Sequence, residues 1–478
     1  MIKRLLLVVG CALSMVLIPT ASAQSTPKSA TEHVAVKVDA KIFDGYVGRY
    51  QIAPNFLVSI TREGDHLYAQ ATGQERFELF AESAKEYFAK VALIQVSFKT
   101  DDHGKATEFV LHQGGQDITC KRLEPKTAAS LSPHFAEIDS MVAADFAKRP
   151  VGSVTVGVVS GKQLIWTKSY GDADMENRTP ADQDTVYRIG SITKMFTALM
   201  LEQLVEAGKV HLSDPAEKYF PEIKTVQDRF PGAPPVTLVQ LATHTAGLGM
   251  EPDDLDTYLK GPVSTWEKTL IAALPHTHYK FEPGTRFSYS NIGFAILGAA
   301  LARAAGEPYV EYVPQHIFEP LGMTHSALEP NPEMLPHLSK GYEVGPSGVD
   351  AKTPQREHAG RGYKVPNGAI YTTVGDLARF ASFLMGEGPE SVLKAASLER
   401  FLTQSAVQAD FNLSSGYGLG FGVIRRDNYI AFGHSGGVAG YTAMLQINRQ
   451  AGVGVIVLAN GPANTGSLAL RSLDILSK

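Results

Sequence analysis

Arg188-Ile-Gly-Ser191-Ile-Thr-Lys194-Met-Phe-Thr-Ala is the stretch on which the interpretation of this chain depends. Apolar residues follow Lys194 at helical spacing, and Gly208 is typical of the end of such a helix. Ser191 is then at the N-terminal edge of the helix and Lys194 one turn in, with Cβ atoms about 5–6 Å apart. The positive end of the helix dipole favours an alkoxide at Ser191, and a neighbouring amine supports it. The stretch therefore has the parts of an acyl-transfer nucleophile.

The Ser-x-x-Lys spacing is weak evidence by itself, because it occurs three times in this chain. Ser25–Lys28 contains a proline and lies in a polar segment. Ser391–Lys394 opens an expected surface helix, but no strand or glycine turn precedes it. A serine at a helix start is most often only an N-cap. The assignment of Ser191 as nucleophile therefore depends on the rest of the sequence.

Length and composition indicate a globular protein with more than one domain. The chain has 478 residues, of which 44% are hydrophobic and 19% are charged, and its formal net charge is −5. This mildly acidic balance lacks the basic stripe of a nucleic-acid binder, so no nucleic-acid partner is expected.

Residues 1–23 have the pattern of a cleaved signal peptide. Lys3 and Arg4 precede an apolar run, and Ala21-Ser-Ala23 is a small-residue cleavage site. As a helix the run is too short to cross the roughly 30 Å hydrocarbon core of a bilayer. The alternative is a lipid-modified Cys11, which leaves only a stub of apolar run before it. We therefore expect a periplasmic or secreted protein with no membrane span after cleavage.

Residues 24–37 form a polar linker, and residues 38–124 have the pattern of a small antiparallel β-barrel. Short runs with alternating apolar residues are separated by turn signals such as Glu63-Gly-Asp65. No set of nucleophile, histidine and carboxylate gathers here, so this unit is a lid, a spacer or a binding module. Cys120 is the only cysteine left after signal cleavage, and we interpret it as a small buried apolar residue.

Residues 133–478 have the pattern of an α+β domain. Strands are expected near both of its ends, with helices between them. This order predicts one antiparallel sheet flanked by helices, in which the N-terminal and C-terminal strands pair. Besides the helix from Ser191, the expected helices are 133–148, 293–304 and 374–385, and the expected strands are 153–159, 164–168, 429–432, 442–448 and 453–458.

A second segment with chemical potential contains Tyr289 and Asn291, between a loop signal and a helix. The two side chains face the same way if the segment is extended. A phenol near Ser191 acts as a base only if its pKa falls from ~10 towards 7, and a charged Lys194 about 4 Å away could roughly supply that shift. Alternatively, a neutral Lys194 is itself the base. The residues leave both schemes open, because the proton belongs to the pair.

A third segment, Gly433-His434-Ser435-Gly436-Gly437, lies between two expected strands. Its glycines let a strand edge approach a ligand, and a backbone N–H there could join that of Ser191 in an oxyanion hole. The same residues spell the Gly-x-Ser-x-Gly elbow of α/β-hydrolases, with Ser435 as nucleophile. That arrangement requires a histidine downstream, and none follows His434. We therefore reject it.

No metal or cofactor is expected. His276-Thr-His278 lacks a third ligand nearby, and the pattern His-Glu-x-x-His is absent. Surface or capping roles suit these histidines better.

Taken together, the motifs resemble those of the serine β-lactamase and penicillin-binding superfamily. The chain looks most like the class C β-lactamases and their esterase, D-aminopeptidase and DD-peptidase relatives. The resemblance covers residues 135–478, and residues 38–124 resemble the small lipocalin-like domains attached to such hydrolases. It is carried by Ser191-Ile-Thr-Lys194, Leu241–Leu248, Tyr289-Ser-Asn291, Asn367–Asp376 and His434-Ser-Gly436, in this order.

The resemblance implies a role for each of these residues. Ser191 is acylated, Lys194 and Tyr289 share the acid–base work, and Asn291 orients the substrate amide. The third motif consists of His434, Ser435 and Gly436, and the N–H of Gly437 lies beside that of Ser191 as the oxyanion hole. Class C β-lactamases carry lysine in place of His434, and a neutral histidine holds a substrate carboxylate only weakly.

The expected function is an exported serine hydrolase that acts through a Ser191 acyl-enzyme on a small peptide, amide or ester. We expect a D-amino-acid peptidase or esterase rather than an efficient β-lactamase. The alternative is a penicillin-recognising sensor that is acylated without turnover. A catalytically inactive binding protein does not suit the intact set of Ser191, Lys194 and Tyr289.

Overall fold

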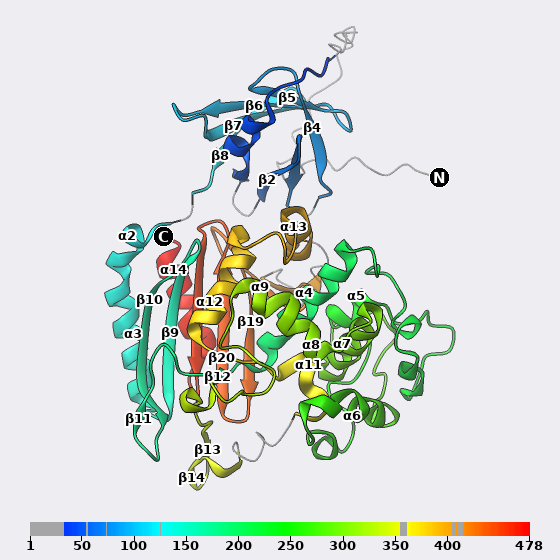
Figure 1. Ribbon diagram of the computed structural model, residues 1–478, viewed down its shortest axis with the longest axis vertical. Helices are drawn as coiled ribbons and strands as arrows, with labels where there is room; N and C mark the ends of the chain where they lie inside the picture. The colour runs from blue at the N-terminus through cyan, green and yellow to red at the C-terminus, as the bar shows by residue number, and fades with distance from the viewer. Residues whose placement is uncertain are drawn as a thin grey trace, which may run out of the picture.

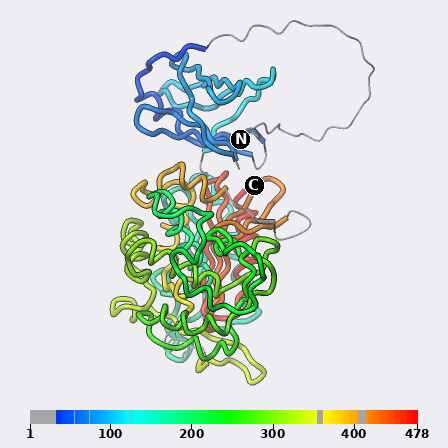
Figure 2. Tube along the Cα trace, turned by 90° about the vertical axis from the view of Figure 1, so that its right-hand side faces the viewer, coloured from blue at the N-terminus to red at the C-terminus, as the bar shows by residue number. Residues whose placement is uncertain are grey.

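The computed structural model describes residues 33–53, 56–72, 74–124, 126–353, 361–403, 407–408 and 414–478. The expected signal peptide, the alternative lipid site Cys11, the Ser25–Lys28 pair and most of the linker lie outside the described residues. Figures 1 and 2 show two bodies, a small one of strands from the N-terminal part and a larger one of helices and strands from the rest.

The small body is a closed antiparallel barrel in which each strand pairs with the next and β1 pairs with β8. Aromatic rings fill its interior: Tyr46 and Phe98 stack with ring centroids 4.2 Å apart, and Tyr87 meets Phe98 edge-on. Cys120 is buried here, and burial raises the pKa of its thiol to about 12. The strands are β1 (Gly48–Ala53), β2 (Phe56–Glu63), β3 (His66–Ala71), β4 (Phe77–Ala81), β5 (Glu86–Ala89), β6 (Ile94–Thr100), β7 (Ala106–Gln113) and β8 (Gln116–Arg122).

The larger body is built on an antiparallel sheet with the strand order β11-β10-β9-β21-β20-β19-β18-β17-β16. At its centre β9 pairs with β21, so the N-terminal and C-terminal strands pair as expected. Both strands are rich in valine and buried along their whole length, as suits strands covered on both faces. The bounds are β9 (Ser153–Ser160), β10 (Gln163–Asp174), β11 (Thr179–Pro180), β16 (Val407–Gln408), β17 (Ser415–Tyr417), β18 (Gly422–Arg425), β19 (Ile430–Val438), β20 (Tyr441–Asn448) and β21 (Val453–Ala459).

Helices cover both faces of this sheet (Figure 1). The helices α3 (Phe135–Lys148) and α14 (Thr465–Leu476) pack on one face, and α12 (Val374–Ser382) packs on the other. Beyond α12 lies the helical part of the domain, whose apolar core contains α4 (Thr193–Glu206) and α7 (Asn291–Ala305). This is the α+β architecture, preceded by a barrel, that the sequence predicts.

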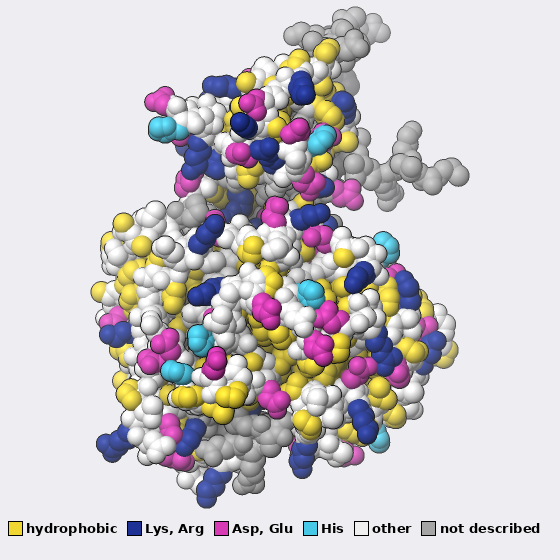
Figure 3. All heavy atoms as spheres, in the orientation of Figure 1, with side chains coloured by type: hydrophobic (Ala, Val, Ile, Leu, Met, Phe, Trp, Pro, Cys, Tyr) yellow, Lys and Arg dark blue, Asp and Glu magenta, His cyan; other side chains and the backbone are white. Residues whose placement is uncertain are grey.

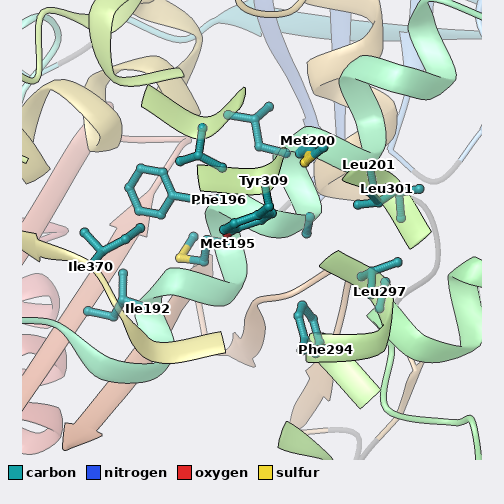
Figure 4. Close-up of a cluster of buried hydrophobic side chains, with 14 of the residues drawn as sticks. Ile192, Met195, Phe196, Met200, Leu201, Phe294, Leu297, Leu301, Tyr309 and Ile370 are labelled. Atoms are coloured by element: carbon teal, nitrogen blue, oxygen red, sulfur yellow. The ribbon is translucent and has the colours of Figure 1, made fainter. Parts of the chain in front are cut away.

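The nucleophile helix α4 is buried on almost every side, which suits a helix whose residues are mostly apolar. Figure 4 shows Met195, Phe196 and Leu201 of α4 in a core that also takes Phe294 and Leu301 of α7. The packing of α4 against α7 fixes the first turn of each helix. The chemistry-bearing residues are located at these two first turns.

The remaining elements connect these layers. The Ser391–Lys394 pair lies before α13 and does not open a helix, contrary to the prediction from the sequence.

On the face shown in Figure 3, Lys and Arg side chains are interspersed with Asp and Glu. The shorter elements are α1 (Phe43–Tyr46), α2 (Ala128–Leu131), α5 (Leu238–Ala242), α6 (Trp266–Ala273), α8 (Tyr309–Val313), α9 (Glu319–Leu321), α11 (Val365–Gly368), α13 (Ala395–Thr403), β12 (Tyr187–Arg188), β13 (Glu343–Gly345), β14 (Gly348–Asp350), β15 (Tyr371–Thr372) and the 3-10 turns η3 (Gly190–Ile192), η4 (Ala216–Lys218) and η11 (Gly362–Lys364).

Candidate active site

Gly190 begins the turn that presents Ser191. Its φ is +49°, and a β-carbon there would lie 2.8 Å from the backbone nitrogen of Gly437, so a side chain is excluded on both grounds. The turn η3 leads directly into α4, with Ser191 partly exposed and Lys194 fully buried. The two side chains meet as the helical spacing predicts, with Nζ of Lys194 3.2 Å from Oγ of Ser191.

The amine of Lys194 has three hydrogen-bonding neighbours. Its Nζ lies 2.7 Å from Oδ1 of Asn291 and 3.1 Å from the carbonyl oxygen of Asn367, in addition to Oγ of Ser191. Burial lowers the pKa of Lys194 well below its usual value. A neutral amine has two N–H groups, which suit the two carbonyl oxygens, and a lone pair that remains for the hydroxyl proton of Ser191. The arrangement matches a nucleophile with its base.

Tyr289 reaches this group from the segment before α7. Its side chain is hydrogen-bonded to Ser191, and Nζ of Lys194 lies 4.8 Å from its ring centroid. Burial raises the pKa of the Tyr289 hydroxyl above its usual value. A phenolate base requires the opposite shift, so the structure favours Lys194 as the base. Tyr289 is then a neutral hydroxyl that can pass a proton.

Asn291 is the first residue of α7, and its amide joins Lys194 to a carboxylate that the sequence patterns did not reveal. Its Nδ2 donates a hydrogen bond to Oε1 of Glu251 at 2.8 Å. Glu251 also accepts hydrogen bonds from Nζ of Lys364 at 2.7 Å and from the hydroxyl of Tyr363. The only sequence signal for Glu251 is its place three residues after the motif that ends at Leu248.

His434 is buried in β19 and carries no charge at neutral pH. The hydroxyl of Tyr417 donates to its Nε2 at 2.8 Å, and its Nδ1 donates to the carbonyl oxygen of Ser435. Burial, with the nearby Lys194, lowers the pKa of His434 to about 3. A neutral imidazole offers no fixed positive charge to a substrate carboxylate. Tyr417 is a second residue of the site that the sequence did not indicate.

His244 is another buried histidine and lies in the motif Leu241–Leu248. Its ring centroid is 4.2 Å from that of Tyr289 and 4.7 Å from that of Tyr417. Its Nδ1 accepts the backbone N–H of Ser290 at 3.0 Å. His244 therefore packs against the Tyr289 ring and holds the backbone of the segment that carries it.

The strand β19 passes Ser191 with part of its backbone unpaired. β18 pairs with β19 only over residues 430–433, so in the described chain residues 434–438 have no strand partner on that side. The sequence predicts that these residues lie between two strands, but β19 continues through them to Val438 because they pair with β20. Ser435 and Gly437 are exposed on this edge.

The backbones of β19 and η3 are in close contact. A β-carbon at Gly436 would lie 1.9 Å from the carbonyl oxygen of Ile189 and 3.3 Å from the nitrogen of Ser191. The backbones of Ser191 and Gly437 therefore lie on adjoining segments, because a β-carbon at Gly190 would lie 2.8 Å from the nitrogen of Gly437. This juxtaposition suits an oxyanion hole.

The described ranges show neither a membrane-spanning helix nor a metal-binding cluster. They contain no helix long and apolar enough to cross a membrane, and no group of three His, Cys, Asp or Glu residues that could hold a metal ion. Both ring nitrogens of His278 are engaged by carboxylates, with Asp228 at 2.7 Å and Asp253 at 2.8 Å.

Comparison with protein families agrees with this geometry. The model described as Beta-lactamase matches residues 138–477, which is most of the chain. The chain belongs to the Beta-lactamase family. A second model, described as a domain of unknown function (DUF3471), matches residues 32–126 and so covers the barrel.

Individual relatives place the chain within the superfamily that the motifs resemble. Over 225 residues it is 33% identical to the D-alanyl-D-alanine-carboxypeptidase/endopeptidase AmpH of Escherichia coli (strain K12), which covers 47% of this chain and 54% of that protein. The octameric penicillin-binding protein homologue from Pyrococcus abyssi superposes with a TM-score of 0.61 and 28% identity, over 72% of this chain and 77% of that one. A class C β-lactamase shares the fold, with a TM-score of 0.60 and 20% identity over 73% and 98% of the two chains.

The chain spans 54% to 62% of the length of the curated relatives that it matches first. The family match and these relatives confirm that the chain resembles the serine β-lactamase and penicillin-binding superfamily.

Proposed function

We propose that this protein is an exported serine hydrolase that forms an acyl-enzyme at Ser191 with a peptide, amide or ester. One observation carries the proposal: two carbonyl oxygens engage Nζ of Lys194 at 2.7 and 3.1 Å, which leaves its lone pair for Oγ of Ser191 at 3.2 Å. A buried, neutral amine is a base poised beside a nucleophile. Proton transfer of this kind typically contributes about 10²–10⁴-fold to a rate.

The reaction follows from the positions of the groups. Lys194 takes the hydroxyl proton as Oγ of Ser191 attacks the substrate carbonyl carbon. The N–H groups of Ser191 and Gly437 stabilise the oxyanion, and the proton leaves through Lys194 and the Tyr289 hydroxyl to the departing group. A water molecule then attacks the acyl-enzyme in the reverse sense, releases the acid and restores Ser191.

The proposed substrate is a D-amino-acid peptide, amide or ester rather than a β-lactam that is hydrolysed efficiently. The neutral state of His434 supports this choice, because the site then lacks the fixed charge that a lysine at that position supplies. The name of the relative AmpH, a D-alanyl-D-alanine-carboxypeptidase/endopeptidase, points the same way. We further propose a periplasmic or secreted location, on the basis of the signal-peptide pattern in residues 1–23.

A substrate panel tests the proposal. p-Nitrophenyl esters, D-amino-acid amides and nitrocefin are assayed with the wild type, Ser191→Ala and Lys194→Ala. We expect turnover of at least one ester or amide by the wild type, and a loss of about 10³-fold or more in each folded variant. Unchanged rates in either variant would refute the assignment, and a burst without steady-state turnover on every substrate would favour the acylated sensor.

A further inference from the structure

The carboxylate of Glu251 contacts the amide of Asn291, which in turn contacts the amine of Lys194. It accepts hydrogen bonds from Nδ2 of Asn291 at 2.8 Å, from Nζ of Lys364 at 2.7 Å and from the hydroxyl of Tyr363. The side chains of Glu251 and Lys364 are only 20% and 16% exposed, so water screens their charges incompletely. Neither residue belongs to the motifs that carry the family resemblance.

The hydrogen bond from Asn291 to Glu251 decides which way the Asn291 amide faces. An amide side chain has a donor nitrogen and an acceptor oxygen, whereas an ionised carboxylate only accepts. Glu251 therefore selects Nδ2, and Oδ1 is left facing Lys194 at 2.7 Å. In this orientation Oδ1 of Asn291 accepts a hydrogen bond from the Lys194 amine, which helps to direct the lone pair of that amine towards Ser191.

We propose that Glu251 is a positioning residue that holds the Asn291 amide against Lys194. Together with Lys364, it forms a pair of opposite charges that sets the protonation state of the Lys194 amine. The inference rests on the proposed function, in which Lys194 is the base.

The two charges act on Lys194 in opposite directions. Burial lowers the pKa of Lys194 most, the negative charge of Glu251 raises it, and the positive charges of Lys364 and Arg361 lower it. Burial also keeps the other titratable groups at the site uncharged near neutral pH, since it lowers the pKa of both histidines and raises that of the phenol. The groups that face Lys194 are Glu251 and His244 after α5, Tyr289 before α7, Arg361 and Lys364 at η11, and His434 in β19.

The test is the pH dependence of kcat/KM for the wild type, Glu251→Gln and Lys364→Met on the best substrate of the panel. The acid limb of this profile follows the loss of the proton from Lys194. Glu251→Gln keeps an acceptor for Asn291 but removes the negative charge, so the acid limb should move to lower pH by on the order of one unit. Lys364→Met should move it to higher pH by a similar amount, and the double variant should return close to the wild type.

A third variant separates the hydrogen bond from the charge. Glu251→Ala removes both, so the Asn291 amide is free to turn away from Lys194. We expect its kcat to be about five- to tenfold below that of Glu251→Gln, with KM little changed, because the lost contact orients the base and does not hold the substrate.

The matched control is Lys218→Met, which removes an exposed lysine paired with Asp214, away from the site. Its profile should superimpose on that of the wild type, and thermal unfolding should verify that all variants are folded. An acid limb that does not move in Glu251→Gln and Lys364→Met, or that moves the same way in both, overturns the inference. If Ser191→Ala is inactive in the same experiment, only the inference fails; if Ser191→Ala is active, the proposed function fails.

Discussion

The imidazole of His434 limits what the site can recognise. Burial lowers its pKa to about 3, so the ring is neutral throughout the physiological range. We therefore predict that the ratio of kcat/KM for a substrate with a free C-terminal carboxylate to that of its amide is constant between about pH 5 and 9.

Parallel assays of such a substrate pair across this range measure the ratio. The expected constancy follows because no positive charge appears on His434 as the pH falls. A preference for the free carboxylate that grows severalfold as the pH approaches 6 would show that His434 is protonated there, contrary to the buried geometry.

The sequence could predict those site residues whose partners are close to them along the chain. Ser191 and Lys194 are three apart on one helix, and the helical repeat alone brings them together. Glu251 and Tyr417 are different, because an irregular segment brings Glu251 to the site and the end of the strand β17 brings Tyr417 there, each from a distant part of the chain. No repeat or spacing predicts such contacts, and a lone glutamate or tyrosine in a sequence is usually structural.

At the scale of elements, the contact between β19 and η3 positions the nucleophile against the sheet. Gly436 makes the contact possible, because a β-carbon there would lie 1.9 Å from the carbonyl oxygen of Ile189, whereas a β-carbon at Gly437 would meet no atom within 4 Å. Strands on both sides of these glycines could be predicted from the sequence. The continuation of β19 through them could not be predicted, since glycine-rich segments more often form turns.

The two glycines provide a matched pair of variants. Gly436→Ala should lower the free energy of unfolding by about 3 kcal/mol, and should reduce activity strongly because β19 must move away from η3. Gly437→Ala should change stability by about 0.5 kcal/mol or less, because the space around that position is open. Chemical denaturation and the ester assay measure both effects. Equal stability losses in the two variants would contradict the close contact.

At the scale of the whole molecule, α13 connects the barrel to the nucleophile helix. Glu399 accepts a hydrogen bond from Nη2 of Arg449 at 2.5 Å and is also hydrogen-bonded to Ser59 of the barrel. The next residue, Arg400, pairs with the buried Glu202 of α4. A cleft of about 480 Å³ lies beside Glu399 and Arg449 between the two bodies. Two neighbouring side chains of α13 thus link the barrel to the helix that carries Lys194.

The charge of Glu399 should be important for stability. Glu399→Ala leaves Arg449, whose side chain is only 8% exposed, without its carboxylate. We expect the free energy of unfolding to fall by about 3 kcal/mol, because an uncompensated buried charge is costly. The control Glu108→Ala breaks an ion pair with Lys99, whose side chain is 63% exposed, and should cost less than about 1 kcal/mol. Calorimetric unfolding measures both; a loss for Glu399→Ala no larger than the control would contradict a buried link.

The overall architecture was largely predictable from the sequence, and the docking of its two bodies was not. Alternating residues indicate the barrel, and strands at both ends of the second domain predict the β9–β21 pairing. Docking depends on a few charged residues, such as Arg49 of the barrel and Glu399 of α13, that are far apart in the chain. In a sequence they are indistinguishable from solvated surface charges.

Trapping of the acyl-enzyme tests the central claim most directly. The wild type is incubated with a fluorophosphonate or with a slowly hydrolysed ester, digested, and analysed by mass spectrometry, with Ser191→Ala as the parallel sample. We expect a single adduct, on the peptide that contains Ser191, and none in the variant. An adduct on Ser435 or on any other residue, or turnover of substrate by Ser191→Ala, would contradict the claim.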